Sequence, residues 1–279
     1  MKALMLCILT CLFALMNRNA LAQESKLFLV AGQSNCVGKG DSALSVICEP
    51  QTAFEYRAEK DTLVSLKDPV GEDFFDFQHA RYGSAWPSFA RQYHQLTGDK
   101  VIIVPAARDG SSCNHKAELP GDGTWDRKGK KLLFGNAIKK VKMAEAKTAL
   151  SLSGIIWVQG ERDANEINEG DMTADEYKVS LQDLITRFRN ELNENVPFYI
   201  ILTGNYVGHP EKGPEQVRKV QNSVAGEKNK VYVVYRAAKD FHDRKWMRSD
   251  GIHYIQTAYN DIGEKTAINI FNITKRANK

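Results

Sequence analysis

Runs of apolar, mostly β-branched residues recur along the chain, and segments with helical periodicity separate most of them. These runs have the length of buried strands and lie at Leu27–Ala31, Val101–Val104, Ile155–Val158, Phe198–Leu202 and Val231–Tyr235. Continuously apolar strands that alternate with helices are typical of a parallel sheet covered on both faces. The pattern therefore predicts an α/β fold, a three-layer α/β/α sandwich around a five-stranded, mainly parallel sheet.

The clearest helix follows Thr173, because Thr173 and Glu176 have the spacing of a capping box. Its apolar positions share one face, as in a helix packed on a core. Weaker helical patterns cover Ala85–Leu96, Leu132–Ala146, Glu215–Ala225 and Thr257–Phe271. Two segments without a clear period are predicted as inserted loops, Ser42–Tyr82 and Asn114–Lys130. Right-handed crossovers bring all strand-to-helix loops to one edge of the sheet, called the rim below.

The first 22 residues read as a secretory signal peptide. Lys2 precedes the apolar stretch Ala3–Met16, and Ala20-Leu21-Ala22 is a small-x-small cleavage site. The apolar stretch is shorter than the roughly 20 residues that span a bilayer, which disfavours a membrane anchor. We therefore expect a cleaved leader, residues 1–22, a secreted or periplasmic protein, and one domain over residues 23–279.

Charge and cysteine content narrow the possible partners and cofactors. The chain has 38 basic and 34 acidic residues, a balance too even to indicate nucleic-acid binding. Cys36, Cys48 and Cys113 follow the leader, and the sequence is consistent with one disulfide plus a free thiol or with three reduced cysteines. No cluster of ligands has metal-site spacing, so we expect neither metal nor cofactor.

Gly32-Gln33-Ser34-Asn35 directly follows the first predicted strand and puts a hydroxyl at the rim. In open α/β sheets, ligands bind in the crevice beyond the carboxyl ends of the strands. Glycine beside the serine lets the backbone turn sharply enough to present its Oγ. The same tetrapeptide also fits a turn in which serine or asparagine caps the next helix. A nucleophilic role requires a base, an acid that orients the base, and oxyanion donors.

Three later segments contain residues suited to these roles. The second predicted strand leads into a small-residue loop at Gly110, where a backbone N–H is unobstructed. The third strand is followed by Gln159, an amide donor, and Glu161, a carboxylate. Asp250 lies three residues before His253, so its carboxylate can accept the Nδ1–H and leave Nε2 to face a serine. The four segments together supply complementary parts of one nucleophilic mechanism.

These segments resemble the SGNH hydrolase superfamily, and within it the carbohydrate esterases that include acetyl xylan esterases and sialic acid O-acetylesterases. The resemblance spans nearly the whole chain after the leader. It rests on Gly32-Gln33-Ser34-Asn35, Gly110-Ser111-Ser112, Gln159-Gly160-Glu161-x-Asp163 and Asp250-Gly251-Ile252-His253. It implies a flavodoxin-like sheet and a serine acetylesterase whose partner is an acetylated carbohydrate, such as an acetylated sialic acid or xylan.

The resemblance also implies a role for each matched residue. The catalytic residues would be Ser34 as nucleophile, His253 as general base, Asp250 as its orienting acid, and Glu161 as a supporting carboxylate. The oxyanion hole would consist of the N–H groups of Ser34 and Gly110 and the side-chain amide of Gln159.

Two positions depart from the family pattern. Cys36 stands where methionine is usual, and both side chains are soft and apolar. Arg108-Asp109 precede Gly110 where a second glycine is common, which puts charge near the substrate. The sequence also leaves two other functions open, an SGNH lipase or lysophospholipase and a non-catalytic carbohydrate-binding protein. The loops near the rim show no amphipathic lid pattern, which argues against the lipase.

Several further residues have two interpretations. His115 and His209 lie on rim loops from which they could reach substrate, but they also fit surface positions. Tyr82, Trp86 and Trp125 fit either aromatic platforms for a sugar ring or packing in the core. We therefore assign none of the five to the site.

Overall fold

Seven strands form one sheet in the computed structural model, which describes residues 24–277. The strands are β1 (Ser25–Gly32), β2 (Ala53–Arg57), β3 (Thr62–Ser65), β4 (Lys100–Ala107), β5 (Leu152–Val158), β6 (Phe198–Ile201) and β7 (Val231–Tyr235). Their order is β3-β2-β4-β1-β5-β6-β7, and all neighbours are parallel except β2 and β3. The predicted leader lies outside the described residues.

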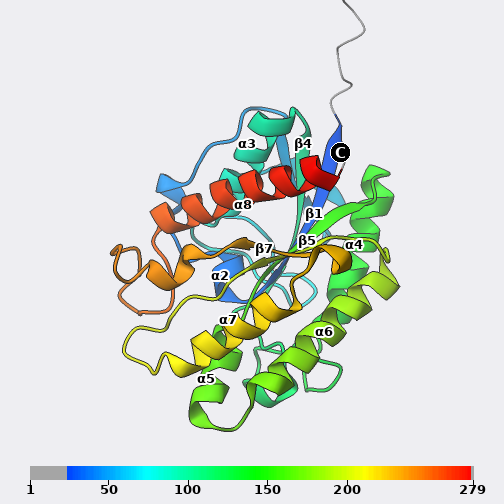
Figure 1. Ribbon diagram of the computed structural model, residues 1–279. Helices are drawn as coiled ribbons and strands as arrows, with labels where there is room; N and C mark the ends of the chain where they lie inside the picture. Colours follow the sequence, from blue (N-terminus) through cyan, green and yellow to red (C-terminus); the bar gives the residue numbers. More distant parts are fainter. Residues whose placement is uncertain (1–23, 278–279) are drawn as a thin grey trace, which may run out of the picture.

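Helices cover both faces of the sheet, so the predicted three-layer sandwich is confirmed (Figure 1). Helices α3 (Trp86–Thr97) and α8 (Gln256–Ala277) pack against each other on one face. The other face carries α4 (Phe134–Thr148), α6 (Ala174–Glu191) and α7 (Lys212–Val224), with α5 (Glu161–Glu169) packed against α7. The short α2 (Ser34–Val37) follows the central strand. Four 3₁₀ turns complete the described elements: η2 (Ser42–Leu44), η3 (His115–Ala117), η4 (Glu227–Asn229) and η5 (Ala237–Asp240).

The central strand β1 is buried on both sides, as its unbroken apolar sequence predicts. Leu27 and Leu29 belong to the core shared with α4, α6 and α7. Phe28 and Val30 point the other way, into the core shared with α3 and α8. Because alternate residues of one strand serve two cores, the strand has a fixed register and its carboxyl end has a fixed place.

The predicted strand count was too low by two, because β2 and β3 lie inside the segment predicted as an inserted loop. Strand β3 is a four-residue edge strand without a buried position. Strand β2 contains Glu55, which is 1% exposed and accepts a hydrogen bond from the Gly71 N–H at 3.0 Å. A polar residue buried by such a contact removes the apolar run that identifies a strand.

The five predicted helices correspond to α3, α4, α6, α7 and α8. The capping box of α6 is present, with Thr173 Oγ1 accepting from the Glu176 N–H and Glu176 accepting from the Thr173 N–H. Helix α5 was missed, because it has nine residues and alanine and isoleucine are its only apolar positions.

The structure settles the open alternatives for the cysteines and for two of the aromatic residues. Cys36, Cys48 and Cys113 are all free. Trp86 and Trp125 are 2% and 0% exposed, so both belong to the core and neither is a sugar platform. Within residues 24–277, no helix has the length and apolar character needed to cross a bilayer.

A buried ion pair ties the segment after β3 to α4. The Lys140 side chain is fully buried, and its Nζ lies 3.0 Å from Glu72 Oε1. The same glutamate accepts the Ala58 N–H at 2.6 Å. Gln78, further along this segment, accepts the Asp109 N–H at 2.7 Å, so the segment supports a loop of the rim.

Removing the charge of Glu72 should destabilise the fold. We expect Glu72→Gln to lower the free energy of unfolding by about 3–5 kcal/mol, because it leaves the Lys140 charge buried without its partner. The double variant Lys140→Met/Glu72→Gln should lose less than the single variant. Urea unfolding followed by circular dichroism measures both, and a single variant as stable as the wild type would contradict the expectation.

Candidate active site

The turn after β1 presents Ser34 at the rim. Gly32 has φ +146°, and a Cβ there would lie 2.0 Å from the Val158 carbonyl oxygen of the neighbouring strand, so only glycine fits. Gln33 is extended, its N–H donates to the Val158 oxygen at 3.0 Å, and α2 begins at Ser34. The Ser34 side chain therefore leaves the sheet at the carboxyl end of its central strand.

The loop before α8 brings His253 to Ser34. The distance from His253 Nε2 to Ser34 Oγ is 2.8 Å, and that from His253 Nδ1 to Asp250 Oδ2 is 3.0 Å. The other Asp250 oxygen accepts the N–H groups of Ile252 and His253 at 3.1 and 2.9 Å. A carboxylate on Nδ1 fixes the tautomer in which Nε2 accepts the hydroxyl proton. The structure thus brings together the three predicted residues.

The environment of Asp250 favours its ionised form. Partial burial raises its pKa, but the hydrogen bonds from the His253 N–H and ring and from the Ile252 N–H outweigh this effect. The pKa of Asp250 is therefore lowered, and the carboxylate stays charged beside the imidazole.

Glu161 lies beneath the serine turn rather than beside the histidine. It is 4% exposed, and its Oε1 accepts from Asn35 Nδ2 at 2.8 Å. The same amide nitrogen donates to the Ile252 carbonyl at 3.2 Å, and Asn35 Oδ1 accepts from the Tyr259 hydroxyl at 2.8 Å. Asn35 therefore joins the serine turn to the histidine loop, and Glu161 orients Asn35.

The loop after β4 places Gly110 beside the serine turn. The Arg108 N–H and the Ser111 hydroxyl both donate to the Gly32 carbonyl, at 3.2 and 3.1 Å. Gly110 has φ +67°, and a Cβ there would lie 2.1 Å from Asp122 Oδ2. Among residues 24–277, no backbone oxygen or side chain accepts a hydrogen bond from the N–H of Ser34 or Gly110. Both of these predicted oxyanion donors are available.

Gln159 differs from its predicted position as the third oxyanion donor. Its Nε2 donates to the Ser111 carbonyl at 3.3 Å and to Asp163 Oδ2, so both amide protons are used. The side chain is 1% exposed and does not line the pocket in front of Ser34. In this arrangement Gln159 supports the Gly110 loop from the side away from the pocket.

Asp163 fixes the same loop, a role that its motif position alone did not reveal. Its two oxygens accept the N–H groups of Cys113 and Asn114, each at 2.9 Å. Burial raises its pKa to about 6, although these hydrogen bonds lower it. Gln33 acts similarly on the other side of the serine turn, where its Oε1 accepts the N–H groups of Gly160 and Arg162, both at 3.2 Å.

A pocket of about 290 Å³ opens in front of Ser34 and His253. Its polar wall includes Arg162 and Asn165, and Lys39 is ion-paired with Asp109 at its edge. Of the two charged residues before Gly110, Asp109 faces the pocket and is paired with Lys39, whereas Arg108 does not line the pocket and donates to the carbonyls of Asp76 and Gly121. The remaining lining side chains are Gln33, Leu119, Tyr206 and Ile252.

The two rim histidines do not line this pocket. His115 Nδ1 lies 3.3 Å from Asp126 Oδ2, and the His209 ring stacks on Tyr206 with centroids 3.7 Å apart. His209 thus contacts Tyr206, which lines the pocket.

One carboxylate cluster among the described residues has the spacing to share a cation. It consists of Glu166, Glu169 and Asp171 near the end of α5. Glu166 is already paired with Arg162, and the other two are exposed. The cluster contributes no residue to the pocket lining.

Solved structures of several proteins share this fold. A protein from Arabidopsis thaliana is 20% identical, with 89% of this chain and 98% of that chain covered and a TM-score of 0.67. NanS is 14% identical, with 91% and 98% covered and a TM-score of 0.64. A carbohydrate acetylesterase from Xanthomonas citri is 17% identical, with 89% and 56% covered and a TM-score of 0.57. At these identities the likeness shows the fold.

The sequence itself shows the family. No curated protein sequence matches the chain. A family model described as carbohydrate esterase, sialic acid-specific acetylesterase matches residues 24–272 and so spans the sheet, the serine turn and the histidine loop. The chain therefore belongs to this family of carbohydrate esterases and is an acetylesterase with an SGNH-type fold.

Proposed function

We propose that this protein hydrolyses acetyl esters on a sugar through a covalent acetyl-enzyme on Ser34. One observation carries the proposal: His253 Nε2 lies 2.8 Å from Ser34 Oγ while Asp250 holds Nδ1 at 3.0 Å. A serine is a weak nucleophile until an adjacent base takes its proton, and this is the geometry such a transfer needs.

The reaction has two halves that use the same residues. His253 takes the Ser34 proton as Oγ attacks the acetyl carbonyl, and the oxyanion is bound by the free N–H groups of Ser34 and Gly110. The imidazolium, stabilised by Asp250, gives its proton to the departing sugar oxygen. Water then attacks the acetyl-enzyme, His253 takes a water proton, and acetate leaves as Ser34 regains its hydrogen.

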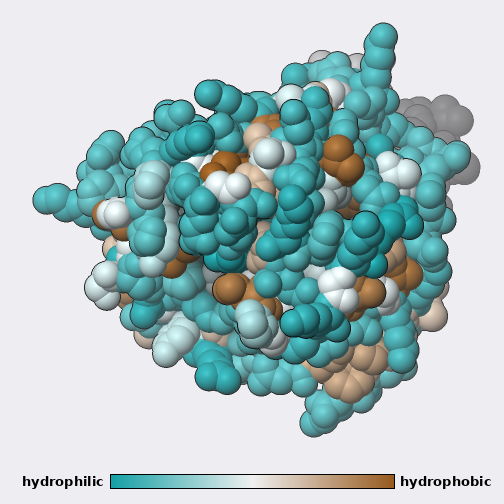
Figure 2. All heavy atoms as spheres, turned by 90° about the horizontal axis from the view of Figure 1, so that it is seen from below, coloured by the Kyte–Doolittle hydropathy of each residue, from teal (hydrophilic) through white to brown (hydrophobic). Residues whose placement is uncertain are grey.

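The pocket favours an acetylated sugar over a long-chain ester. Arg162, Asn165, Gln33 and the Lys39–Asp109 pair offer hydrogen-bonding groups for hydroxyls, whereas a fatty acyl chain needs an extended apolar wall. Figure 2 shows a face on which hydrophilic residues predominate and apolar ones form small separate groups. The acetylated unit would be a sialic acid or a sugar of a glycan such as xylan. The leader-like residues 1–22 support a secreted or periplasmic site of action.

Ser34→Ala should abolish acetate release while leaving the fold intact. The hydroxyl forms the only covalent link to the acetyl group, and alanine fits the buried space of Ser34. We expect turnover of 4-nitrophenyl acetate to fall by several orders of magnitude, with an unchanged melting temperature. A Ser34→Ala protein that keeps wild-type turnover contradicts the mechanism, and an inactive wild type would support a carbohydrate-binding protein instead.

The substrate class is tested by chain length and by sugar. We expect wild-type kcat/KM to be highest for acetyl esters and to fall for longer acyl chains, because the pocket holds about 290 Å³. Acetate release is then compared on acetylated sialic acids, acetyl xylan and acetylated peptidoglycan. A preference for long-chain esters over all of these would identify a lipase.

Gln159→Ala should lower kcat by about 10²-fold or more, the usual cost of a disturbed oxyanion hole. Because Gln159 holds the Gly110 loop through Ser111 and Asp163, we also expect a lower melting temperature. A lower kcat with an unchanged melting temperature would assign Gln159 the direct oxyanion role that the sequence predicts. Near wild-type turnover would contradict both roles.

A further inference from the structure

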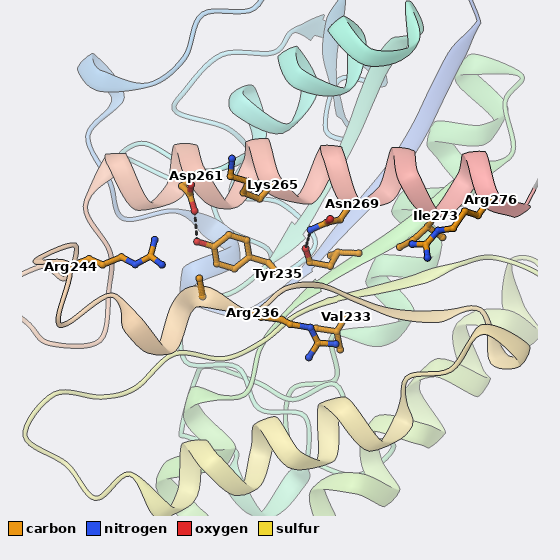
Figure 3. Close-up of a pocket in the computed structure, with 11 residues that line it drawn as sticks. Val233, Tyr235, Arg236, Arg244, Asp261, Lys265, Asn269, Ile273 and Arg276 are labelled. Carbon is orange, nitrogen blue, oxygen red and sulfur yellow. Dashed lines mark hydrogen bonds between the residues drawn. The ribbon is translucent and has the colours of Figure 1, made fainter.

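A basic groove runs between α8 and the edge strand β7, outside the pocket of Ser34. A cavity of about 500 Å³ is lined by Arg236, Arg244, Lys265 and Arg276 around an apolar floor that includes Val233. Figure 3 shows Arg244 at one end and Arg276 at the other, with Lys265 on the helix between them. A second cavity of about 300 Å³ shares Ile273 and Arg276 with the first and adds Lys230 and Tyr232. The two cavities adjoin at Ile273 and Arg276, and together they are called the basic groove below.

The three arginines of the groove, Arg236, Arg244 and Arg276, have no ion-pair partner among the described residues. Lys265, by contrast, is paired with Glu264 at 3.2 Å. The acid Glu227 also lines the smaller cavity. Asp261, the acid that lines the larger cavity, accepts the Tyr235 hydroxyl at 2.5 Å. Arg244 lies over the Trp246 ring, 5.1 Å from its centroid, which positions a guanidinium without cancelling its charge. The groove therefore has an excess of positive charge in a chain that is nearly neutral overall.

The edge of β7 is closed to an added strand. Gly226 and Val231 exchange hydrogen bonds at 2.8 and 3.2 Å at the start of the strand. The Val234 carbonyl accepts from Asn269 Nδ2 on α8 at 2.8 Å. Because both ends of this short edge are occupied, a peptide has no run of free backbone groups to pair with. The occupant must be recognised through the side chains.

We infer that this groove binds an anionic polysaccharide chain, with the arginines contacting its carboxylates or sulfates. Guanidinium groups bind such planar or tetrahedral anions by paired hydrogen bonds. Tyr232 adds an aromatic surface, since it lines the smaller cavity and stacks on Tyr199 with centroids 5.9 Å apart. The choice of a carbohydrate over another polyanion rests on the proposed function. Arg236 directly follows β7 and lines the larger cavity, so this cavity reaches the carboxyl end of the strand, which is the rim side of the sheet.

The test uses binding rather than turnover. Polygalacturonate, with a carboxylate on each sugar, is titrated into the full-length mature protein at low salt, beside neutral dextran and a short DNA duplex. We expect wild type to bind polygalacturonate and not dextran, with an affinity that falls as salt rises. Arg236→Gln/Arg244→Gln/Arg276→Gln should weaken this binding about tenfold or more.

A matched control removes three charges elsewhere. Lys60→Gln/Lys128→Gln/Lys219→Gln changes exposed positions that line neither cavity, and it should leave binding within about twofold of wild type. Equal loss in both triple variants, no binding of polygalacturonate by wild type, or tighter binding of DNA or dextran would overturn the inference.

Two further measurements separate this inference from the catalytic proposal. The groove variant should hydrolyse 4-nitrophenyl acetate at the wild-type rate, and Ser34→Ala should bind polygalacturonate as wild type does. Binding without any acetylesterase turnover in wild type would refute the proposed function and leave the groove standing. Turnover without binding would do the reverse.

Discussion

The close approach of β1 and β5 at the rim is the constraint on which the site depends. Gly32 passes so near the Val158 carbonyl that no side chain fits, and its own carbonyl accepts the Arg108 N–H and the Ser111 hydroxyl from the loop after β4. The Gln33 N–H donates to the Val158 oxygen. The backbone of Gly32-Gln33 therefore joins β1 to β5 and to the loop after β4, and Ser34 follows immediately. The backbone thereby fixes where the serine leaves the sheet.

Around Gly32-Gln33, buried polar side chains position the rim loops, which are not paired through their backbones as strands are. Gln33, Asn35, Gln159 and Asp163 each join two rim loops, and all four are at most 3% exposed. Buried polar groups cost free energy unless they are hydrogen-bonded, so a network of this kind holds one arrangement and excludes others. The charged residues Asp250 and Lys39 lie further out, where solvent reduces that cost. The site is thus rigid beneath the serine and polar in front of it.

The sequence predicted the parts of the molecule that depend on local pattern. Parallel strands buried on both faces leave continuous apolar runs, so β1, β4, β5, β6 and β7 were visible, and their order gave the rim. Strands β2 and β3 were not, because an edge pair with buried Glu55 lacks that signature. The same limit applied to the site. Residue types and spacing indicated Ser34, His253 and Asp250, but the hydrogen bonds of Gln159 depend on which way a buried amide points, which no spacing encodes. The basic groove was invisible for a similar reason, since its cations come from separate elements.

The loop of residues 241–255 contributes to both the pocket in front of Ser34 and the basic groove. Met247 pairs with Tyr254 across this loop, and the Arg248 N–H donates to the His253 carbonyl at 2.8 Å. These contacts make a narrow loop with Asp250 and His253 near its tip and Arg244 at its base. The Trp246 N–H donates to the Phe241 carbonyl at 2.8 Å, and the Phe241 ring packs on Tyr254, so the base is fixed to the core. A polymer seated along β7 would contact the base without bending the tip, because the paired section between them resists it. Binding of the chain and hydrolysis of its ester would then be separate functions of one loop, because the hydrogen bonds of His253 and Ser34 involve none of the arginines of the groove.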